Sequence, residues 1–167
     1  MLSTRYRNYP VVDEQNAFLG FISRYNLLEM KRKKLILVDH NERKQAVEGV
    51  EETEILEIID HHRVGDLQTI SPIYFHNEPV GSTCTLIAEK YLTEGMALGS
   101  NLAGLLLSGM LSDTMIFKSP TTTSKDRQIA QQLQDISGLD GLEWGKQILK
   151  HTINTQMLSD EELITSD

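Results

Sequence analysis

Short hydrophobic runs fill the first part of the chain, and they predict β-strands bounded by turn residues. The runs are residues 9–12 ("YPVV"), 18–22 ("FLGFI"), 35–39 ("LILVD"), 55–59 ("ILEII") and a third buried-type strand within "TISPIYFHNEP", which Pro72 interrupts. The first two flank the turn "DEQNA" and predict a strand pair, followed by a helical turn at residues 24–30. The runs at 35–39 and 55–59 are typical of strands covered on both faces.

From residue 81 onward the hydrophobic positions recur at helical spacing. The predicted helices lie in residues 81–95, 101–117, 124–138, 141–153 and 159–167. Ser82 is the expected N-cap of the first, and Gly95 and Gly138 are expected stops. The segment 101–117 is apolar nearly all round, which predicts a core helix. Residues 42–54 have helical composition but contain Gly49, so we expect a short or broken helix there.

Strands alternating with helices predict an α/β fold with a parallel sheet and flanking helices. Twenty-one positions separate Asp39 from Asp60, which is enough for a crossover that returns to a parallel neighbour. The carboxyl ends of both strands then lie at one edge of the sheet, where ligands bind. We therefore expect Asp39 and His61 to meet in space.

Composition and charge narrow the class of protein. The chain has 167 residues, 40% of them apolar, which suits one globular domain or one domain with a further segment. Residues 1–34 carry seven Lys or Arg and three Asp or Glu (net +4), and residues 35–167 carry nine and twenty-one (net −12). The acidic body argues against general nucleic-acid binding but allows a phosphate substrate if bound cations reverse the local field. "KRKK" is read as a solvated basic connector rather than a nucleic-acid patch.

Apolar runs, the N-terminal residues and the cysteine count indicate the cellular compartment of the protein. No apolar run reaches the ~18 residues of a membrane span, and the first ten residues lack the apolar core of a secretory signal. Cys84 is the single cysteine, so a disulfide within the chain is impossible. This agrees with a reducing cytoplasm, and Cys84 is expected to pack as a small hydrophobic residue.

Candidate chemistry begins with "EIIDHH", where an apolar strand ends in Asp60, His61 and His62. Imidazole nitrogen and carboxylate oxygen together suit Mn²⁺, Zn²⁺ or Fe²⁺. One histidine can bind the metal while its neighbour contacts the substrate, and Asp60 can orient a histidine. The alternative is that these are ordinary polar residues of a strand end.

Two further carboxylates are candidates. Asp39 ends the neighbouring strand and can bridge two metals, or it can be a solvated turn residue or a cap. Asp113 ends the most apolar helix, where a charge is costly unless it is paired or binds a metal; the alternative is an acid bonded to Ser112 or Thr114. His40 and Asn41 are weaker candidates. We interpret His40, His76 and His151 as surface or structural residues, Gly81 as part of an ordinary N-cap, and Lys118 as a residue of a structured loop.

The blocks "LILVDHNE", "EIIDHHR", "EPVGST" and "LSDTMIFKSPTTT", in this order, resemble the DHH phosphoesterase superfamily. More narrowly they resemble the family II, manganese-dependent inorganic pyrophosphatases, over residues 35 to about 165. Residues 9–29 resemble the tail of a CBS (cystathionine-β-synthase-type) regulatory module, which some members carry inside the catalytic domain. The resemblance implies two parts, a C-terminal CBS remnant at 1–33 and a partial DHH catalytic domain at 34–167.

The resemblance also implies roles for individual residues. Asp39 would bridge two Mn²⁺ ions (Co²⁺ or Mg²⁺ are alternatives), His61 would bind one of them, and Asp113 would complete that metal's protein ligands. His62 would contact the phosphate, with Asp60 in support. The implied reaction is hydrolysis of pyrophosphate to two phosphates by a cytoplasmic homodimer, and adenine nucleotides would bind the CBS module only in a full-length form.

The chain departs from the family pattern in two ways. The first metal motif of the family, His-x-Asn-Pro-Asp-x-Asp, does not occur in the 167 residues, and the C-terminal domain that clamps the substrate is missing. We therefore expect the middle of a longer enzyme, inactive or very weakly active alone. The alternatives are a DHH-type phosphodiesterase acting on short oligonucleotides or cyclic dinucleotides, and a non-catalytic truncated protein.

Overall fold

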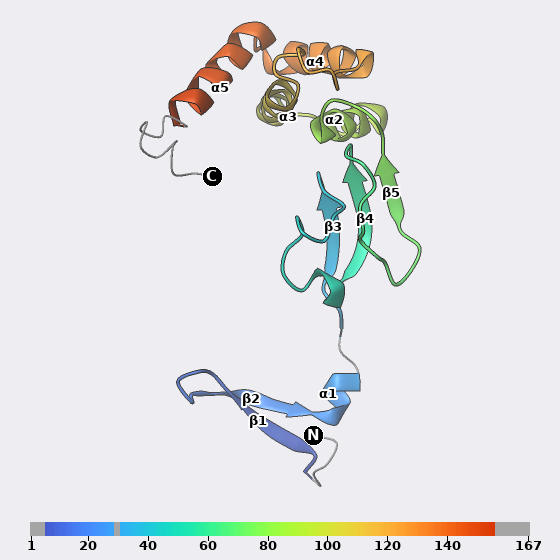
Figure 1. Cartoon of the computed structure of the whole chain (residues 1–167), viewed down its shortest axis with the longest axis vertical. Coiled ribbons are helices and arrows are strands. Elements are labelled where there is room, and N and C mark those ends of the chain that lie inside the picture. Colours follow the sequence, from blue (N-terminus) through green and yellow to red (C-terminus); the bar gives the residue numbers. More distant parts are fainter. Residues whose placement is uncertain (1–5, 29–30, 156–167) are drawn as a thin grey trace.

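The computed structural model describes residues 6–28 and 31–155, with side chains of helical residues described up to residue 151. The elements are stacked along the long axis of the molecule (Figure 1). An N-terminal hairpin lies at one end, a small parallel sheet in the middle and a layer of helices at the other end. In the part of the chain described, no helix combines the length and the hydrophobicity needed to cross a membrane.

The hairpin confirms the predicted strand pair. β1 (Asn8–Val12) pairs antiparallel with β2 (Phe18–Ser23), and the short helix α1 (Arg24–Leu28) follows. The connecting turn forms because the Asp13 carboxylate accepts backbone hydrogen bonds from Gln15 and Ala17, while Asn16 takes the left-handed backbone conformation that asparagine tolerates. The turn residues therefore set the register of the two strands.

The three buried-type runs form the predicted parallel sheet. β3 (Lys34–Val38), β4 (Glu54–Asp60) and β5 (Tyr74–Asn77) pair in this order. One face packs Leu37 and Ile58 under the connecting loops, and the other buries Ile59 against the first helix of the layer. All three strands point toward the helices in Figure 1, so their carboxyl ends meet the helical layer.

The helix expected within residues 42–54 is largely absent. Only the 3₁₀ turn η1 (Val50–Glu52) forms there, after Gly49 in the left-handed conformation. The preceding residues instead bind a distant loop: the backbone N–H of Arg43 donates to the Asp66 carboxylate at 2.9 Å. Tertiary contacts therefore override the helical composition of this segment.

Four longer helices form the layer: α2 (Thr83–Thr93), α3 (Ser100–Asp113), α4 (Ser124–Ser137) and α5 (Gly141–Thr155). Ser82 caps α2 as predicted, because its hydroxyl accepts from the N–H of Cys84. α3 is the core helix of the layer, since Leu107, Met110 and Leu111 have no exposed surface. The helix expected at 159–167 lies outside the described residues.

α3 ends at Asp113, earlier than the predicted residue 117. Met115, Ile116 and Phe117 all have positive φ, between 49° and 58°, so a left-handed turn replaces the last predicted helical residues. This turn is costly for a β-branched residue such as Ile116, and it is held by the surrounding structure. Arg127 donates to the Phe117 carbonyl oxygen at 2.8 Å and lies over the Phe117 ring.

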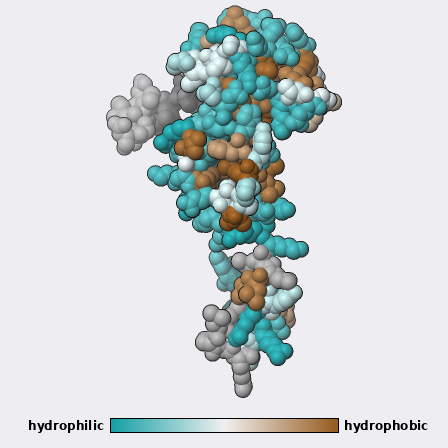
Figure 2. Space-filling view, turned by 90° about the vertical axis from the view of Figure 1, so that its right-hand side faces the viewer, coloured by the Kyte–Doolittle hydropathy of each residue, from teal (hydrophilic) through white to brown (hydrophobic). Residues whose placement is uncertain are grey.

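Hydrophobic surface is distributed unevenly over these parts. In Figure 2, brown hydrophobic side chains reach the surface in the middle of the molecule, below the helical layer. The hairpin exposes large hydrophobic side chains, since Phe18, Leu19 and Phe21 are 59%, 65% and 71% exposed. The main hydrophobic core lies in the helical layer, and a smaller core lies under the sheet.

Candidate metal centre

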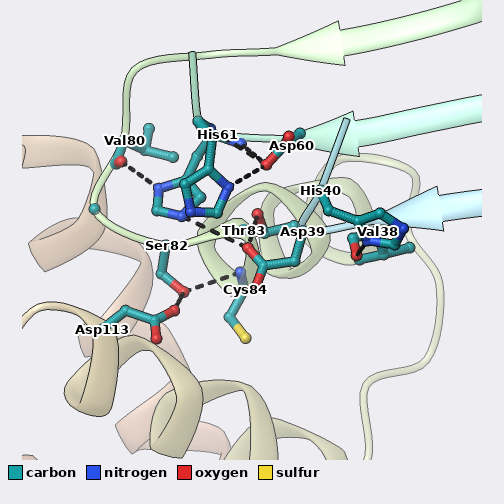
Figure 3. Close-up of polar contacts among 12 residues, drawn as sticks. Val38, Asp39, His40, Asp60, His61, Val80, Ser82, Thr83, Cys84 and Asp113 are labelled. Atoms are coloured by element: carbon teal, nitrogen blue, oxygen red, sulfur yellow. Dashed lines mark hydrogen bonds and ion pairs between the residues drawn. The ribbon is translucent and has the colours of Figure 1, made fainter. Parts of the chain in front are cut away.

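His61 follows the last residue of β4 and presents one ring nitrogen toward Asp39. Its Nδ1 lies 2.9 Å from the backbone carbonyl oxygen of Val80 (Figure 3). A carbonyl can only accept, so Nδ1 carries the hydrogen and Nε2 keeps its lone pair. Nε2 lies 3.6 Å from Oδ1 of Asp39. The backbone of Val80 therefore selects the tautomer that can bind a metal through Nε2.

Asp39 stands at the equivalent position after β3. Its N–H still donates to the Ile59 carbonyl oxygen of β4 at 2.9 Å, and then the backbone turns left-handed with a φ of 68°. Aspartate and asparagine visit this region more readily than other side chains. The carboxylate accepts one hydrogen bond, from Thr83 Oγ1 at 2.7 Å, and the side chain is 55% exposed. Most of its lone pairs therefore face open space.

Asp39, His61 and His62 each offer a ligand atom, and these atoms lie within 4.8 Å of one another. Between Nε2 of His61 and Oδ1 of Asp39 there are two acceptors and no hydrogen, and a cation would satisfy both. Ligand bonds of roughly 2.0–2.2 Å allow two ligands of one ion to lie up to about 4.4 Å apart. The pair formed by Asp39 and His61 therefore fits a divalent metal, and the assignment of these residues as its ligands stays a prediction.

Asp60 lies beneath this cluster and orients His62. It has no exposed surface, and its Oδ1 accepts from the backbone N–H groups of His61 and His62 and from Nδ1 of His62 at 2.7 Å. Its Oδ2 accepts from the side-chain amide of Asn41. Burial raises the pKa of Asp60, but these hydrogen bonds outweigh burial and hold it below its ordinary value. A charged Asp60 fixes the Nδ1–H tautomer of His62 and leaves its Nε2 free.

Asp113 faces the same region from α3 but lies farther from the cluster. Its Oδ2 accepts from the Ser82 hydroxyl at 2.6 Å, and it is not among the described residues whose ligand atoms lie within 4.8 Å of one another. Figure 3 shows Asp113 below Ser82, which lies between it and His61. The bond to Ser82 replaces the partners Ser112 and Thr114 considered above: the Thr114 hydroxyl donates to the Met110 carbonyl oxygen instead. Its role as a metal ligand stays a prediction.

Two residues of the site, Thr83 and Asp126, were not identified from the sequence, and Asn41 was only a weaker candidate. Asn41 is buried, and it joins Asp60 to the backbone of Arg63 and Gly65. Thr83 holds the Asp39 carboxylate. The pattern Thr123-x-x-Asp126 is a capping-box signal at a helix start, and it was visible in the sequence.

The weaker candidates behave as expected where the structure describes their contacts. His40 bonds through Nδ1 to the Val38 carbonyl oxygen, and His76 pairs with Glu78 at 3.5 Å. Burial raises the pKa of the Cys84 thiol, and the nearby carboxylates of Asp113 and Asp39 act in the same direction. A thiol of this kind is a poor nucleophile, in agreement with packing as a hydrophobic residue.

Two curated relatives of this chain are inorganic pyrophosphatases. The cobalt-dependent inorganic pyrophosphatase of Clostridium perfringens is 46% identical over 167 residues, which are 100% of this chain and 30% of that protein. The manganese-dependent inorganic pyrophosphatase of Bacillus subtilis is 42% identical over 133 residues, or 80% of this chain and 43% of that protein. The chain thus spans less than half the length of these curated relatives.

A solved structure from Methanococcus jannaschii, described as a family II inorganic pyrophosphatase, is also similar. It superimposes with a TM-score of 0.68 at 46% identity, over 72% of this chain and 42% of that one. This likeness confirms the predicted α/β fold with a parallel sheet. The sequence model of the DHH family, N-terminal domain, matches residues 4–110, which is more than half of the chain. The chain therefore belongs to the DHH family, as its Asp60-His61-His62 strand end led us to expect.

Proposed function

We propose that the chain carries part of the catalytic site of a metal-dependent inorganic pyrophosphatase, which hydrolyses pyrophosphate to two phosphates. The observation that carries this proposal is the pair of lone-pair donors, Nε2 of His61 and Oδ1 of Asp39, held 3.6 Å apart by separate strands. The names of the Clostridium and Bacillus relatives support the substrate.

We propose Mn²⁺ as the metal, with Co²⁺ or Mg²⁺ as alternatives. A site of mixed imidazole and carboxylate suits Mn²⁺ and Co²⁺ better than Mg²⁺, which prefers oxygen ligands. Asp39, His61 and Asp113 would hold the ion. When bound, such an ion lowers the pKa of bound water and neutralises charge on the phosphate oxygens.

The protein groups around the ion bind and orient the substrate. His62 is the group we assign to the phosphate, because its ring is half-exposed and its imidazolium form would donate Nε2–H to a phosphate oxygen while Nδ1–H stays bonded to Asp60. The acidic body of the chain repels an anionic substrate, so cations at this edge are needed for binding. Asp60 acts through His62 and does not itself reach the substrate.

Residues 1–33 are assigned to the end of a CBS regulatory module, and the rest to the DHH catalytic domain. The lengths of the relatives support this division. The Clostridium protein aligns over all 167 residues, 30% of its length, so it has about 560 residues. The Bacillus protein aligns over 133, 43% of its length, so it has about 310. The longer relative thus matches the hairpin and has some 250 residues more than the shorter one.

The proposal also covers nucleotide binding, the oligomeric state and the cellular location of the full-length protein. A full-length form would bind adenine nucleotides at the CBS module, would be a homodimer and would reside in the cytoplasm. The exposed hydrophobic side chains of the hairpin support a contact with further protein. Sedimentation of the full-length protein, with and without an adenine nucleotide, tests the dimer and the binding together.

The substrate is tested by phosphate release in the presence of Mn²⁺, with pyrophosphate and a dinucleotide compared. Pyrophosphate should be preferred, while preference for the dinucleotide would favour the phosphodiesterase alternative. We expect the chain alone to be inactive or very weak, because the donors gathered here suit one ion. A turnover near ~10 s⁻¹, an ordinary enzyme rate, would contradict that expectation.

The metal is tested separately by calorimetry with Mn²⁺. His61→Ala should weaken binding strongly, because it removes the nitrogen that faces Asp39. His151→Ala is the control, since His151 bonds to its own helix at the Gln147 carbonyl oxygen and should leave binding unchanged. Equal affinity in both variants would overturn the assignment of the site.

A further inference from the structure

Residues 80–85, which we call the α2 entry segment, touch every predicted metal ligand. The three contacts are His61 Nδ1 to the Val80 carbonyl oxygen at 2.9 Å, Ser82 Oγ to Asp113 Oδ2 at 2.6 Å, and Thr83 Oγ1 to Asp39 Oδ1 at 2.7 Å. Asp39 and His61 directly follow β3 and β4, and Asp113 ends α3, so the three ligands are far apart in sequence. The placement of this one segment therefore decides whether three groups converge.

Asp126, the third residue of α4, anchors the α2 entry segment at two points. Its Oδ2 accepts from the N–H of Gly81 at 2.9 Å, and its Oδ1 accepts from the Thr85 hydroxyl at 2.5 Å. The carboxylate has no exposed surface. Ionic acceptors in such surroundings make hydrogen bonds that are shorter and stronger than neutral ones. The segment is thus held on both sides of the residues that contact Asp39 and Asp113.

The same carboxylate also caps its own helix. Oδ2 accepts from the backbone N–H of Thr123 at 2.7 Å, and the N–H of Asp126 donates to the Thr123 hydroxyl at 3.3 Å, which together form a capping box. The Thr123 hydroxyl also donates to Oδ2 at 2.7 Å. A capping box alone needs only the first two bonds. The contacts with Gly81 and Thr85 cross to another helix, 45 and 41 positions away in sequence. They join the start of α4 to the start of α2.

Close packing at Gly81 limits how the α2 entry segment can move. A Cβ atom there would lie 2.6 Å from the Thr114 side chain and 3.0 Å from Oδ2 of Asp126. Thr114 directly follows Asp113, so the segment packs against the end of α3 as well as against α4. Glycine is required for this approach. The segment is thus confined between the residue that anchors it and the helix that carries Asp113.

We propose that Asp126 is a positioning residue for the metal site. It touches neither the predicted ligands nor the substrate. It acts by fixing the α2 entry segment, which sets the tautomer of His61 and the directions of Asp39 and Asp113. This proposal rests on the proposed metal function for its effect on binding, and on geometry alone for its effect on His61.

The first test is Mn²⁺ affinity in Asp126→Asn, measured by calorimetry on the full chain. Asparagine keeps the size of the side chain, but its N–H₂ group would face the donors that now bond to the Asp126 carboxylate. Loss of such an outer partner typically weakens metal binding about 10–100-fold, and we expect about tenfold here. Asp135→Asn makes the same change on the exposed face of α4 and should alter the affinity less than about twofold.

The second test needs no metal. The ¹⁵N shifts of the His61 ring at a pH where it is neutral should report the Nδ1–H tautomer in the unaltered chain. Asp126→Asn should give a mixture of tautomers, while Asp135→Asn should not. An effect limited to capping α4 would leave the His61 ring unchanged. If Asp126→Asn does not fold, Thr85→Val replaces it, because it removes one donor to Asp126 and preserves the capping box.

The outcomes separate the two proposals. If the unaltered chain binds no Mn²⁺, the metal function is wrong, and the His61 shifts still decide the role of Asp126. If Asp126→Asn keeps both the Mn²⁺ affinity and the His61 tautomer, Asp126 only caps its helix and the present proposal is overturned. Altered shifts with weakened Mn²⁺ binding support both.

Discussion

Asp39 and Asp113 lie in the outer part of the site, where each is exposed and accepts one hydrogen bond from a hydroxyl group. Asp60 and Asp126 lie in the inner part, where neither has exposed surface and each accepts four hydrogen bonds. Outer carboxylates thus keep lone pairs for a cation, whereas the inner ones have their acceptor sites filled by the protein.

Aspartate thus has two different roles in this site, depending on its burial. A buried carboxylate that is fully hydrogen-bonded fixes backbone segments, because removing it leaves several donors without partners. An exposed one contributes little to stability and remains available to ligands. Changes in the inner part should therefore act first on folding and only indirectly on metal binding, whereas changes in the outer part should act directly on metal binding.

The largest effect on stability is expected for Asp60→Ala. It leaves the buried amide of Asn41 and the N–H of His61 without their carboxylate acceptor. Each unsatisfied buried group costs about 1–3 kcal/mol, so the free energy of unfolding should fall by roughly 3 kcal/mol. Urea unfolding measures this. A loss below about 1 kcal/mol would show that water replaces the carboxylate and that the inner part is not a rigid support.

Asp39→Asn should show the opposite behaviour. Asparagine tolerates the left-handed backbone at this position and can still accept from the Thr83 hydroxyl. The free energy of unfolding should therefore change by less than about 0.5 kcal/mol. Mn²⁺ affinity should fall by about a hundredfold or more, because a direct ligand is worth more than an outer partner. Calorimetry and urea unfolding on one preparation test both, and a stability loss without weaker binding would reverse the comparison.

The outer part of the site was easier to predict from the sequence than the inner part. Asp39 and His61 each follow an apolar run, and parallel pairing of two such strands brings their ends together. That inference needs only periodicity and the geometry of a parallel sheet. The N-cap at Ser82 was equally local.

Within the inner part, Asp60 was predicted, and three of its four hydrogen bonds come from the next two residues. Asp126 was not, because it depends on contacts between residues far apart in sequence. The bond between Asp126 and Gly81 joins the starts of two helices, and hydrophobic periodicity says nothing about which starts meet. Residues 42–54 show the same limit, because their helical composition is overridden by the bonds of Asn41 and Arg43 to distant groups. The left-handed turn at Ile116 contradicts its own residue preference and is set by packing.

Acid should destabilise the chain through the inner carboxylates. Burial raises the pKa of Asp126, but hydrogen bonds from Thr85, Thr123 and Gly81 outweigh it and hold the pKa below its ordinary value. The unfolded chain then binds more protons than the folded one, so stability rises with pH. The contribution is complete above the ordinary pKa of about 3.9 and is lost as the pH falls through the folded value.

Urea unfolding between pH 7 and pH 3 measures this dependence. Each such group adds a slope of at most about 1.4 kcal/mol per pH unit. Asp126→Asn should flatten the slope below pH 4, whereas Asp135→Asn on the exposed face of the same helix should keep it. Identical slopes in the two variants would show that Asp126 does not carry the acid sensitivity.

Asp113→Asn should have the smallest effect on stability. Its effect on Mn²⁺ affinity tests whether Asp113 is the third ligand of the metal. Its oxygen can still accept from the Ser82 hydroxyl, so the free energy of unfolding should change by less than about 0.5 kcal/mol. If Asp113 binds the ion, Mn²⁺ affinity should fall at least about tenfold, because a charged ligand is replaced by a neutral one. Unchanged affinity would indicate that His62, not Asp113, is the third ligand of the ion, since the ligand atom of His62 already lies within 4.8 Å of those of Asp39 and His61. The outer part of the site would then be made by the two strand ends alone, and the helical layer would only support it.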